Sequence, residues 1–265
     1  MIKNKYLMFG IFISGALLLL GILGIFWTPY SVTEMNYELR FQAPSLAHLF
    51  GTDNFGRDVF SRVMQGLGIT ILVGAAVVVI SGLIGALLGS LTGYFGGIAD
   101  TVIMRICDVI NGFPSILLGL VFISVLGSGV VNVIAALSIV FVPSFTRIMR
   151  SEFMKLKNME YVQAARLCGA SRLRIMLVHL LPNTLSTYVA AITVGFNNAI
   201  LAEAGMSYLG VGVTPPAISI GRMISEGQSY LFTAPWYPIL PGLVLVLFIL
   251  GFSLLAEGIR RAINA

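Results

Sequence analysis

The chain has 265 residues, of which 57% are hydrophobic and only 10% are charged, and its mean hydropathy is +0.95. Soluble domains carry roughly 25% charged residues, so this composition excludes a soluble globular protein and indicates a polytopic membrane protein. The net charge of +5 does not indicate nucleic-acid binding, because membrane proteins gather Lys and Arg on their cytoplasmic loops.

Apolar stretches long enough to cross a membrane recur along the chain. A helix needs about 20 apolar residues to cross a hydrocarbon core ~30 Å thick. The stretches that satisfy this requirement are 6–27, 69–94, 101–126, 130–149, 184–206 and 236–258. We therefore expect an all-α membrane protein with six transmembrane helices. Its parts would be a first helix with an external segment (1–68) and a core of five helices (69–265).

The distribution of basic residues sets the orientation. Lys3 and Lys5 precede the first span, a basic stretch at 147–174 follows the fourth, and Arg260 and Arg261 follow the sixth. With six spans these groups all lie on one side. Because the basic side is the cytoplasmic side, the sequence predicts that both termini are cytoplasmic.

Small residues mark one face of the second span. Gly85, Gly89 and Gly93 follow one another at intervals of four residues, and Gly82 lies one turn earlier. Glycines at this spacing form a flat helix face on which another backbone can pack closely. This pattern predicts tight helix packing and indicates no particular function.

The basic stretch is the most informative part of the sequence. Seven of the sixteen Lys and Arg residues lie in it: Arg147, Arg150, Lys155, Lys157, Arg166, Arg172 and Arg174. Within it we expect two short coupling helices, placed at about 150–182. Gly169 can end the first in a left-handed conformation, Ser171 can start the second, and Pro182 can open the fifth span. The result would be an exposed helical knob joined directly to membrane helices.

The same stretch resembles the coupling motif of ABC importer permeases. The motif residues are Glu160, Gln163, Ala164, Ala165, Gly169, Leu181 and Pro182. Their spacing matches the family form throughout, with Gln163 in place of Glu and His179 in place of Ile. In that family the motif couples the permease to its ATPase.

A second group of residues narrows the resemblance to the C-type permeases of dipeptide, oligopeptide and nickel importers. It resembles the external signature of that family and consists of Gly51, Thr52, Asp53, Gly56, Arg57, Asp58, Ser61 and Arg62. A binding protein would dock on the external segments 28–68 and 207–235. Arg57 and Asp58 would either take part in this docking or hold the segment folded.

The resemblance implies a type I importer permease fold and a place in the cytoplasmic membrane of a bacterium or archaeon. It implies a non-catalytic subunit that forms half of a pore for short peptides or for nickel and other metal chelates. The partners would be a second permease, two cytoplasmic ATPases that bind ATP and Mg, and an external substrate-binding protein. The alternative is a secondary transporter or channel subunit driven by an ion gradient, which would need inverted repeats or broken helices; the sequence shows neither.

Other polar residues are weaker candidates. Asn197, Asn198 and Glu203 are candidate pore-lining residues, although hydrogen bonds between helices explain the two asparagines equally well. Arg105 and Asp108 have the i, i+3 spacing of an ion pair, and a proton relay is the alternative.

Two kinds of motif are missing from the sequence. It contains no phosphate-binding Gly-x-x-x-x-Gly-Lys loop, so ATP would bind only to partner subunits and this chain would hold no cofactor. It also contains no metal-site spacing. Cys107 and Cys168 are expected to be buried thiols.

Overall fold

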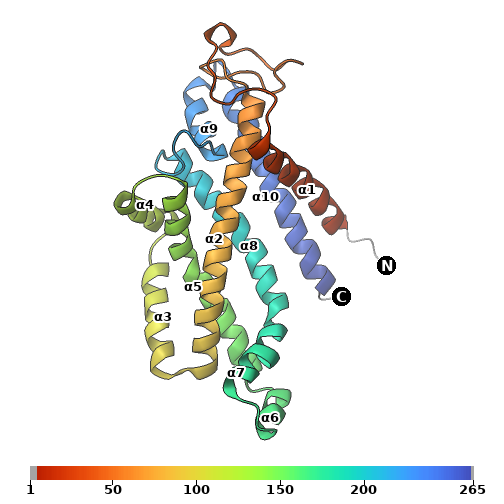
Figure 1. Ribbon diagram of the computed structural model, residues 1–265, viewed down its shortest axis with the longest axis vertical. Coiled ribbons are helices and arrows are strands. Elements are labelled where there is room, and N and C mark those ends of the chain that lie inside the picture. The colour runs from red at the N-terminus through yellow and green to blue at the C-terminus, as the bar shows by residue number, and fades with distance from the viewer. Residues whose placement is uncertain (1–4, 264–265) are drawn as a thin grey trace.

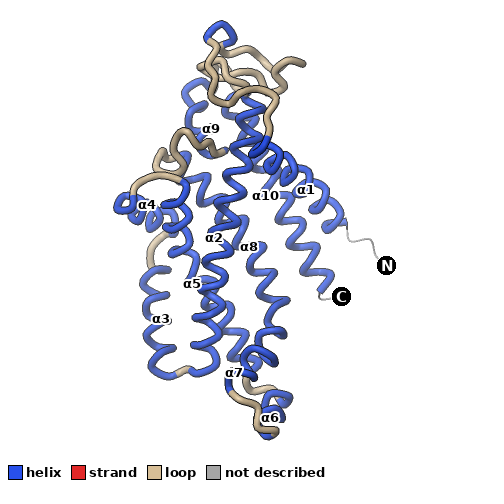
Figure 2. Tube along the Cα trace, viewed as in Figure 1, coloured by secondary structure: helices blue, strands red, loops and turns tan. Residues whose placement is uncertain are grey.

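The computed structural model describes residues 5–263, which form a long bundle of helices with loops gathered mainly at one end (Figures 1 and 2). In chain order the helices are α1 (Lys5–Phe26), η1 (Tyr37–Leu39), α2 (Val59–Phe95), α3 (Gly97–Asn111), α4 (Ser115–Leu126), α5 (Val130–Leu156), α6 (Glu160–Leu167), α7 (Arg172–Arg174), the π-helix η2 (Ile175–Leu180), α8 (Leu181–Tyr208), α9 (Ile220–Gly227), η3 (Gln228–Tyr230) and α10 (Trp236–Ile263). Lys3, used above to orient the chain, lies outside the described residues.

Five continuous helices in the described part of the chain are long and apolar enough to cross a membrane, and the bent pair α3–α4 brings the number to six if it counts as one span. The bent pair does cross the bundle. At its start, Asp100 binds Arg150 near the end of α5, and at its last residue the Leu126 carbonyl accepts a hydrogen bond from Asn132 near the start of α5. From Asn132 to Arg150, α5 rises about 27 Å at 1.5 Å per residue, close to the ~30 Å thickness of the hydrocarbon core.

The third crossing is therefore broken, where the sequence predicted one straight span at 101–126. α3 and α4 meet at 93°, and Figure 1 shows α4 lying across the bundle while α3 runs along it. The break falls at Gly112-Phe113-Pro114. Pro114 lacks an N–H and pushes the residue before it away from helical angles, so the helix ends there and a new one starts.

The glycines of α2 pack against the backbone of α5, as their spacing predicted. A Cβ at Gly85 would lie 2.5 Å from the Phe145 Cβ, and one at Gly93 would lie 2.7 Å from the Arg150 carbonyl oxygen. At Gly89 it would clash with the Thr146 carbonyl oxygen. The two helices therefore touch backbone to backbone along three successive turns.

Close packing at glycines also holds α1 against α2 and α10. Gly10 of α1 faces the Leu255 backbone of α10, and Gly24 faces the Met64 backbone of α2, so closely that neither position has room for a Cβ. One apolar core joins α2, α4, α5 and α8, and a second joins the outer parts of α2, α8, α9 and α10. The first core contains Val162 of α6, which ties the knob to the bundle.

We expect Gly89→Ala to destabilise the protein, because its methyl group would overlap the α5 backbone and overpacking typically costs about 1–3 kcal/mol. The measurement is the melting temperature of the purified full chain in one detergent. Gly15→Ala is the matched control, since a Cβ at Gly15 of α1 meets nothing within 4 Å. Equal melting temperatures for the two variants would contradict the packing account.

Candidate functional site

The knob is the part of the chain that extends farthest from the bundle at the end opposite the loops (Figure 1). We define it as residues 157–174, which include α6 and α7. α6 ends in a complete left-handed turn: Gly169 has φ +81°, its N–H bonds to the Arg166 carbonyl at 3.0 Å, and the Ala170 N–H bonds to the Ala165 carbonyl at 3.0 Å. The Ser171 Oγ then accepts from the Arg174 N–H at 3.3 Å. Both the stop at Gly169 and the start at Ser171 are as predicted from the sequence.

The knob is joined to the bundle by short, bonded connections. Only residues 157–159 separate α5 from α6, and the Met159 N–H bonds to the Leu156 carbonyl at 3.0 Å. On the other side, the helix runs without interruption from Arg172 through η2 to Tyr208. Val162 is fully buried, which fixes the inner face of α6. Displacement of the knob must therefore displace α5 and α8.

This continuity corrects the predicted start of the fifth span. The sequence placed it at 184, with Pro182 at its first turn. Pro182 does lie in the first turn of α8, but α8 continues the helix that begins at Arg172 and follows the wide turn η2, where the Leu181 N–H bonds to the Met176 carbonyl. Proline removes an N–H and crowds the preceding turn, and a π-turn is one way in which a helix accommodates such a disruption.

The residues of the predicted coupling motif divide by exposure. Glu160, Gln163, Ala164, Gly169 and Pro182 are exposed. Ala165 and Leu181 are half-buried toward the bundle. The exposed members leave most of α6 open to a partner.

Sequence reasoning missed Leu167, whose side chain is 89% exposed at the end of α6. The signal was a large apolar residue beside the predicted Gly169 turn, at a position that no bundle helix can cover. Cys168, next to it, is exposed, which corrects the expectation of a buried thiol. Cys107 is buried, as expected.

At the opposite end, the segment 28–58 and α9 form an external cap held by buried charges. Asp53 is fully buried. Its carboxylate accepts from the Arg57 Nε at 2.7 Å and from the Arg62 Nη1 at 2.5 Å. Arg62 also donates to Glu226 of α9 at 2.9 Å. The Asp53 carboxylate thus connects its own turn to the start of α2, and Arg62 extends the connection to α9.

The electrostatics of Glu226 follow from this network. Burial raises the pKa of the Glu226 carboxyl, but the charges and hydrogen bonds of Arg62 and Arg222 outweigh it, so the pKa lies below its ordinary value. A depressed folded-state pKa stabilises the fold above the unfolded value of about 4.3, and the contribution is lost as pH falls through the lower folded value. The contribution of Glu226 to the cap is therefore constant near neutral pH and is lost in acid.

The remaining signature residues also face inward. Asp58 is 3% exposed, accepts from the Ser61 N–H at 2.7 Å as the N-cap of α2, and binds the His48 ring at 2.9 Å. Gly51 and Gly56 have positive φ, and a side chain at either would clash with neighbouring backbone. The geometry therefore favours folding of the segment over docking as the role of Arg57 and Asp58.

Two aromatic residues at the start of α10 also hold the external cap in place. Tyr237 is fully buried and donates to Glu226 at 3.2 Å, and the Trp236 Nε1 donates to the Thr52 carbonyl at 3.2 Å. Both residues fasten α10 to the external cap.

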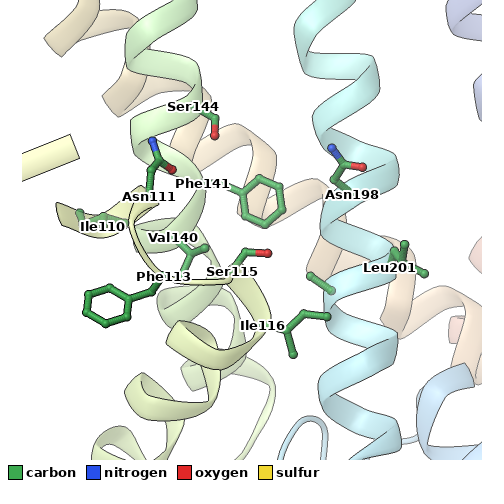
Figure 3. Close-up of a pocket in the computed structure, with 11 residues that line it drawn as sticks. Ile110, Asn111, Phe113, Ser115, Ile116, Val140, Phe141, Ser144, Asn198 and Leu201 are labelled. Atoms are coloured by element: carbon green, nitrogen blue, oxygen red, sulfur yellow. The ribbon is translucent and has the colours of Figure 1, made fainter. Parts of the chain in front are cut away.

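A cavity of about 280 Å³ lies beside the break between α3 and α4. We call it the polar cavity after the four amide and hydroxyl side chains in its otherwise apolar lining. Figure 3 shows Asn111 and Ser115 from the broken helix, Ser144 from α5 and Asn198 from α8 around it. Phe141, Ser144 and Asn198 also line an adjoining cavity of about 370 Å³. These neutral amides and hydroxyls lie among apolar side chains, so the cavity can hydrogen-bond a ligand without placing a charge in the membrane.

The three pore candidates are not placed alike. Asn198 lines this cavity, whereas the Asn197 Nδ2 donates to the Ser253 Oγ of α10 at 3.0 Å. Glu203 is fully buried, and its Oε1 accepts from the Ser207 Oγ at 2.7 Å. Glu203 therefore packs inside the subunit, and the interhelical explanation fits Asn197.

The two carboxylates of α3 form ion pairs with arginines of α5. Asp108 binds Arg147 at 2.6 Å, and Asp100 binds Arg150 at 2.5 and 2.7 Å. The predicted pairing of Arg105 with Asp108 is wrong, because the i, i+3 spacing carried no information on the neighbouring helix. No group of three or more potential metal ligands occurs among residues 5–263.

Comparison with known proteins gives a consistent result. Residues 85–265 match the family described as binding-protein-dependent transport system inner membrane component. The chain is 37% identical to the dipeptide transport system permease protein DppC of Alkalihalophilus pseudofirmus, over 99% of this chain and 86% of that protein. It is 40% identical to the glutathione transport system permease protein GsiD of Escherichia coli, over 93% and 83%. A chain of the inward-facing MetNI methionine ABC transporter has a TM-score of 0.62 at 19% identity, covering 77% of this chain and 96% of that one.

Asp53→Asn should open the external cap, because breaking a buried ion pair by removing one partner typically costs about 3–5 kcal/mol. In this variant Arg62 still has its ion pair with Glu226, so we expect a cost at the lower end of this range. The readout is the rate of proteolysis from the outer face of oriented vesicles. Glu34→Gln is the control: Glu34 is exposed in the same segment and has no ion pair among the described residues. If both variants are cleaved at the wild-type rate, Asp53 does not hold the cap.

Proposed function

Because the chain belongs to the family of binding-protein-dependent transport system inner membrane components and has the type I importer permease fold, we propose that it is one permease subunit of an ATP-driven importer. It is a multi-pass protein of the inner membrane. In the proposed assembly it forms half of the pore and couples that pore to cytoplasmic ATPases.

One observation supports this proposal more than any other: the knob and the polar cavity share the same two helices. α5 leads into the knob and α8 leads out of it, and both line the cavity beside Asn198. A force applied to α6 therefore passes through the short hydrogen-bonded links at 157–159 and 168–171 and then along α5 and α8 to the cavity walls.

The proposed mechanism follows from that connection. Closure of the ATPases on ATP displaces α6, which moves the cytoplasmic parts of α5 and α8 relative to the broken α3–α4 helix. The cavity between them then changes shape and faces the other side of the membrane. Transport requires that the two states bind substrate with different affinity, since equal affinities shift no equilibrium.

Short peptides are the proposed substrate class. Relatives at 37% and 40% identity are named as dipeptide and glutathione transport permeases. The cavity offers amide and hydroxyl groups, such as Asn111, Ser115 and Asn198, which can pair with the backbone amides of a peptide. Nickel or other metal chelates remain the alternative substrate.

The proposed partners are a second, related permease, two ATPase subunits that bind ATP and Mg, and an external binding protein. The second permease would complete the pore wall where the Asn198 cavity opens on the bundle surface. A groove of about 370 Å³ next to it, lined by α8 and α10, extends the same open face.

A gradient-driven transporter is the rival function, and the broken α3–α4 helix is a feature that such transporters use at their binding sites. The sequence did not predict this break. Two observations favour the ATP-driven function: the family match and the exposed knob, for which a gradient-driven transporter has no use.

We expect Leu167→Asp to weaken the association with the ATPase by on the order of tenfold or more, because an interface hot spot is worth about 2 kcal/mol. The readouts are copurification of the ATPases and peptide uptake into membrane vesicles. Leu46→Asp is the matched control: Leu46 is 99% exposed in the external segment. Normal ATPase binding by the Leu167 variant would remove α6 from the proposed interface.

A further inference from the structure

A second pocket lies where the cytoplasmic end of α2 meets the knob. Its volume is about 530 Å³. Its lining combines two aromatic residues that end α2 with two arginines of the knob, and consists of Tyr94, Phe95, Arg166, Ala170, Arg172 and Ile175. None of these residues belongs to the coupling motif or lines the polar cavity.

The pocket carries positive charge that the protein does not neutralise. Within residues 5–263, neither Arg166 nor Arg172 forms an ion pair with a carboxylate. Arg166 lies over the Tyr94 ring, with its Cζ 5.9 Å from the ring centroid, a contact that orients the guanidinium and leaves its charge in place. Two guanidiniums that converge on one pocket are suited to a phosphate.

The pocket lies at the level of the membrane surface. α2 ends at Phe95, and Tyr and Trp concentrate where helices leave the hydrocarbon core. The Lys157 Nζ donates to the Gly93 carbonyl at 2.8 Å, so a basic side chain also caps this end of α2. A phosphate held here would be at headgroup depth.

An exposed apolar stripe on α2 leads to the pocket. Ile84, Leu87, Leu91 and Phe95 follow one another at intervals of three or four residues, and the four side chains are 42%, 61%, 38% and 51% exposed. This spacing places them on one helix face, and Phe95 belongs to both the stripe and the pocket. A ligand with a phosphate in the pocket would thus find an apolar surface for a hydrocarbon chain.

We propose that this pocket binds an anionic phospholipid of the cytoplasmic leaflet, with its phosphate between Arg166 and Arg172 and an acyl chain along the α2 stripe. The lipid then links the end of α2 to α6 and α7 and steadies the knob. A soluble acidic partner would use the arginines but not the stripe, which is why the combined geometry favours a lipid. The proposal does not depend on what the knob binds.

The test compares two arginines on the same short helix. Arg172 lines the pocket, and Arg174, two residues later, does not. The purified full chain in detergent is mixed with phosphatidylglycerol or phosphatidylcholine, and retained lipid is counted by native mass spectrometry. We expect wild type to retain phosphatidylglycerol preferentially. Arg172→Gln should retain about fivefold less, the factor for about 1 kcal/mol per basic residue at an anionic surface, while Arg174→Gln retains the wild-type amount.

A further variant and a stability measurement separate loss of the lipid site from loss of charge or of folding. Arg172→Lys preserves the charge and should retain more lipid than Arg172→Gln, and melting temperatures show whether each variant is folded. Equal loss in the Arg172 and Arg174 variants would mean diffuse attraction and overturn the proposal. So would wild type that shows no preference for phosphatidylglycerol, or displacement of the lipid by inorganic phosphate alone. Loss of ATPase binding with unchanged lipid retention would assign the pocket to a protein partner instead.

Discussion

Backbone contact between α2 and α5 is the constraint on which the rest of the structure depends. In a bilayer, apolar side chains gain little by leaving lipid for one another, so helices associate through close packing. Gly85, Gly89 and Gly93 provide that closeness. α5, like α8, both lines the polar cavity and joins the knob. Its close packing on α2 therefore holds the knob and the cavity in a fixed relation to each other. Without this close packing, α5 could slide along α2, and a displacement of α6 would not reach the cavity.

Charged side chains have two different roles in this structure. On the external side, Asp53, Arg62 and Glu226 are paired and largely buried, and these pairs fasten the external cap to the ends of the helices. On the cytoplasmic side Arg147 and Arg150 are paired as well, with Asp108 and Asp100. Arg166 and Arg172 of the knob have no carboxylate partner among the described residues, so the knob is available to other molecules. Paired charge holds the protein's own segments together, and unpaired charge presents a binding surface.

Local features of the sequence predicted local structure well. The lengths of the apolar stretches predicted the membrane-spanning segments, and the glycine spacing predicted the packed face of α2. Gly169 and Ser171 predicted the turn of the knob. Interactions between distant residues could not be predicted, because nothing in the spacing of Arg105 and Asp108 indicates that Arg147 lies nearer to Asp108. The straight third span failed for a different reason: overall hydropathy concealed the helix-breaking run at 112–114. A polar residue such as Glu203 in an apolar span is a candidate for lining the pore, and only the packing shows that Glu203 is buried.

The most direct test of the account is peptide uptake into liposomes, measured with the chain alone and with the proposed partner permease, ATPases and binding protein. The account predicts no uptake by the chain alone under either a proton or a sodium gradient, because one subunit supplies half of the pore wall and its knob has nothing to move it. The complete assembly should take up peptide only with ATP. Gradient-driven uptake by the chain alone would contradict the account and assign the broken α3–α4 helix to a secondary transporter.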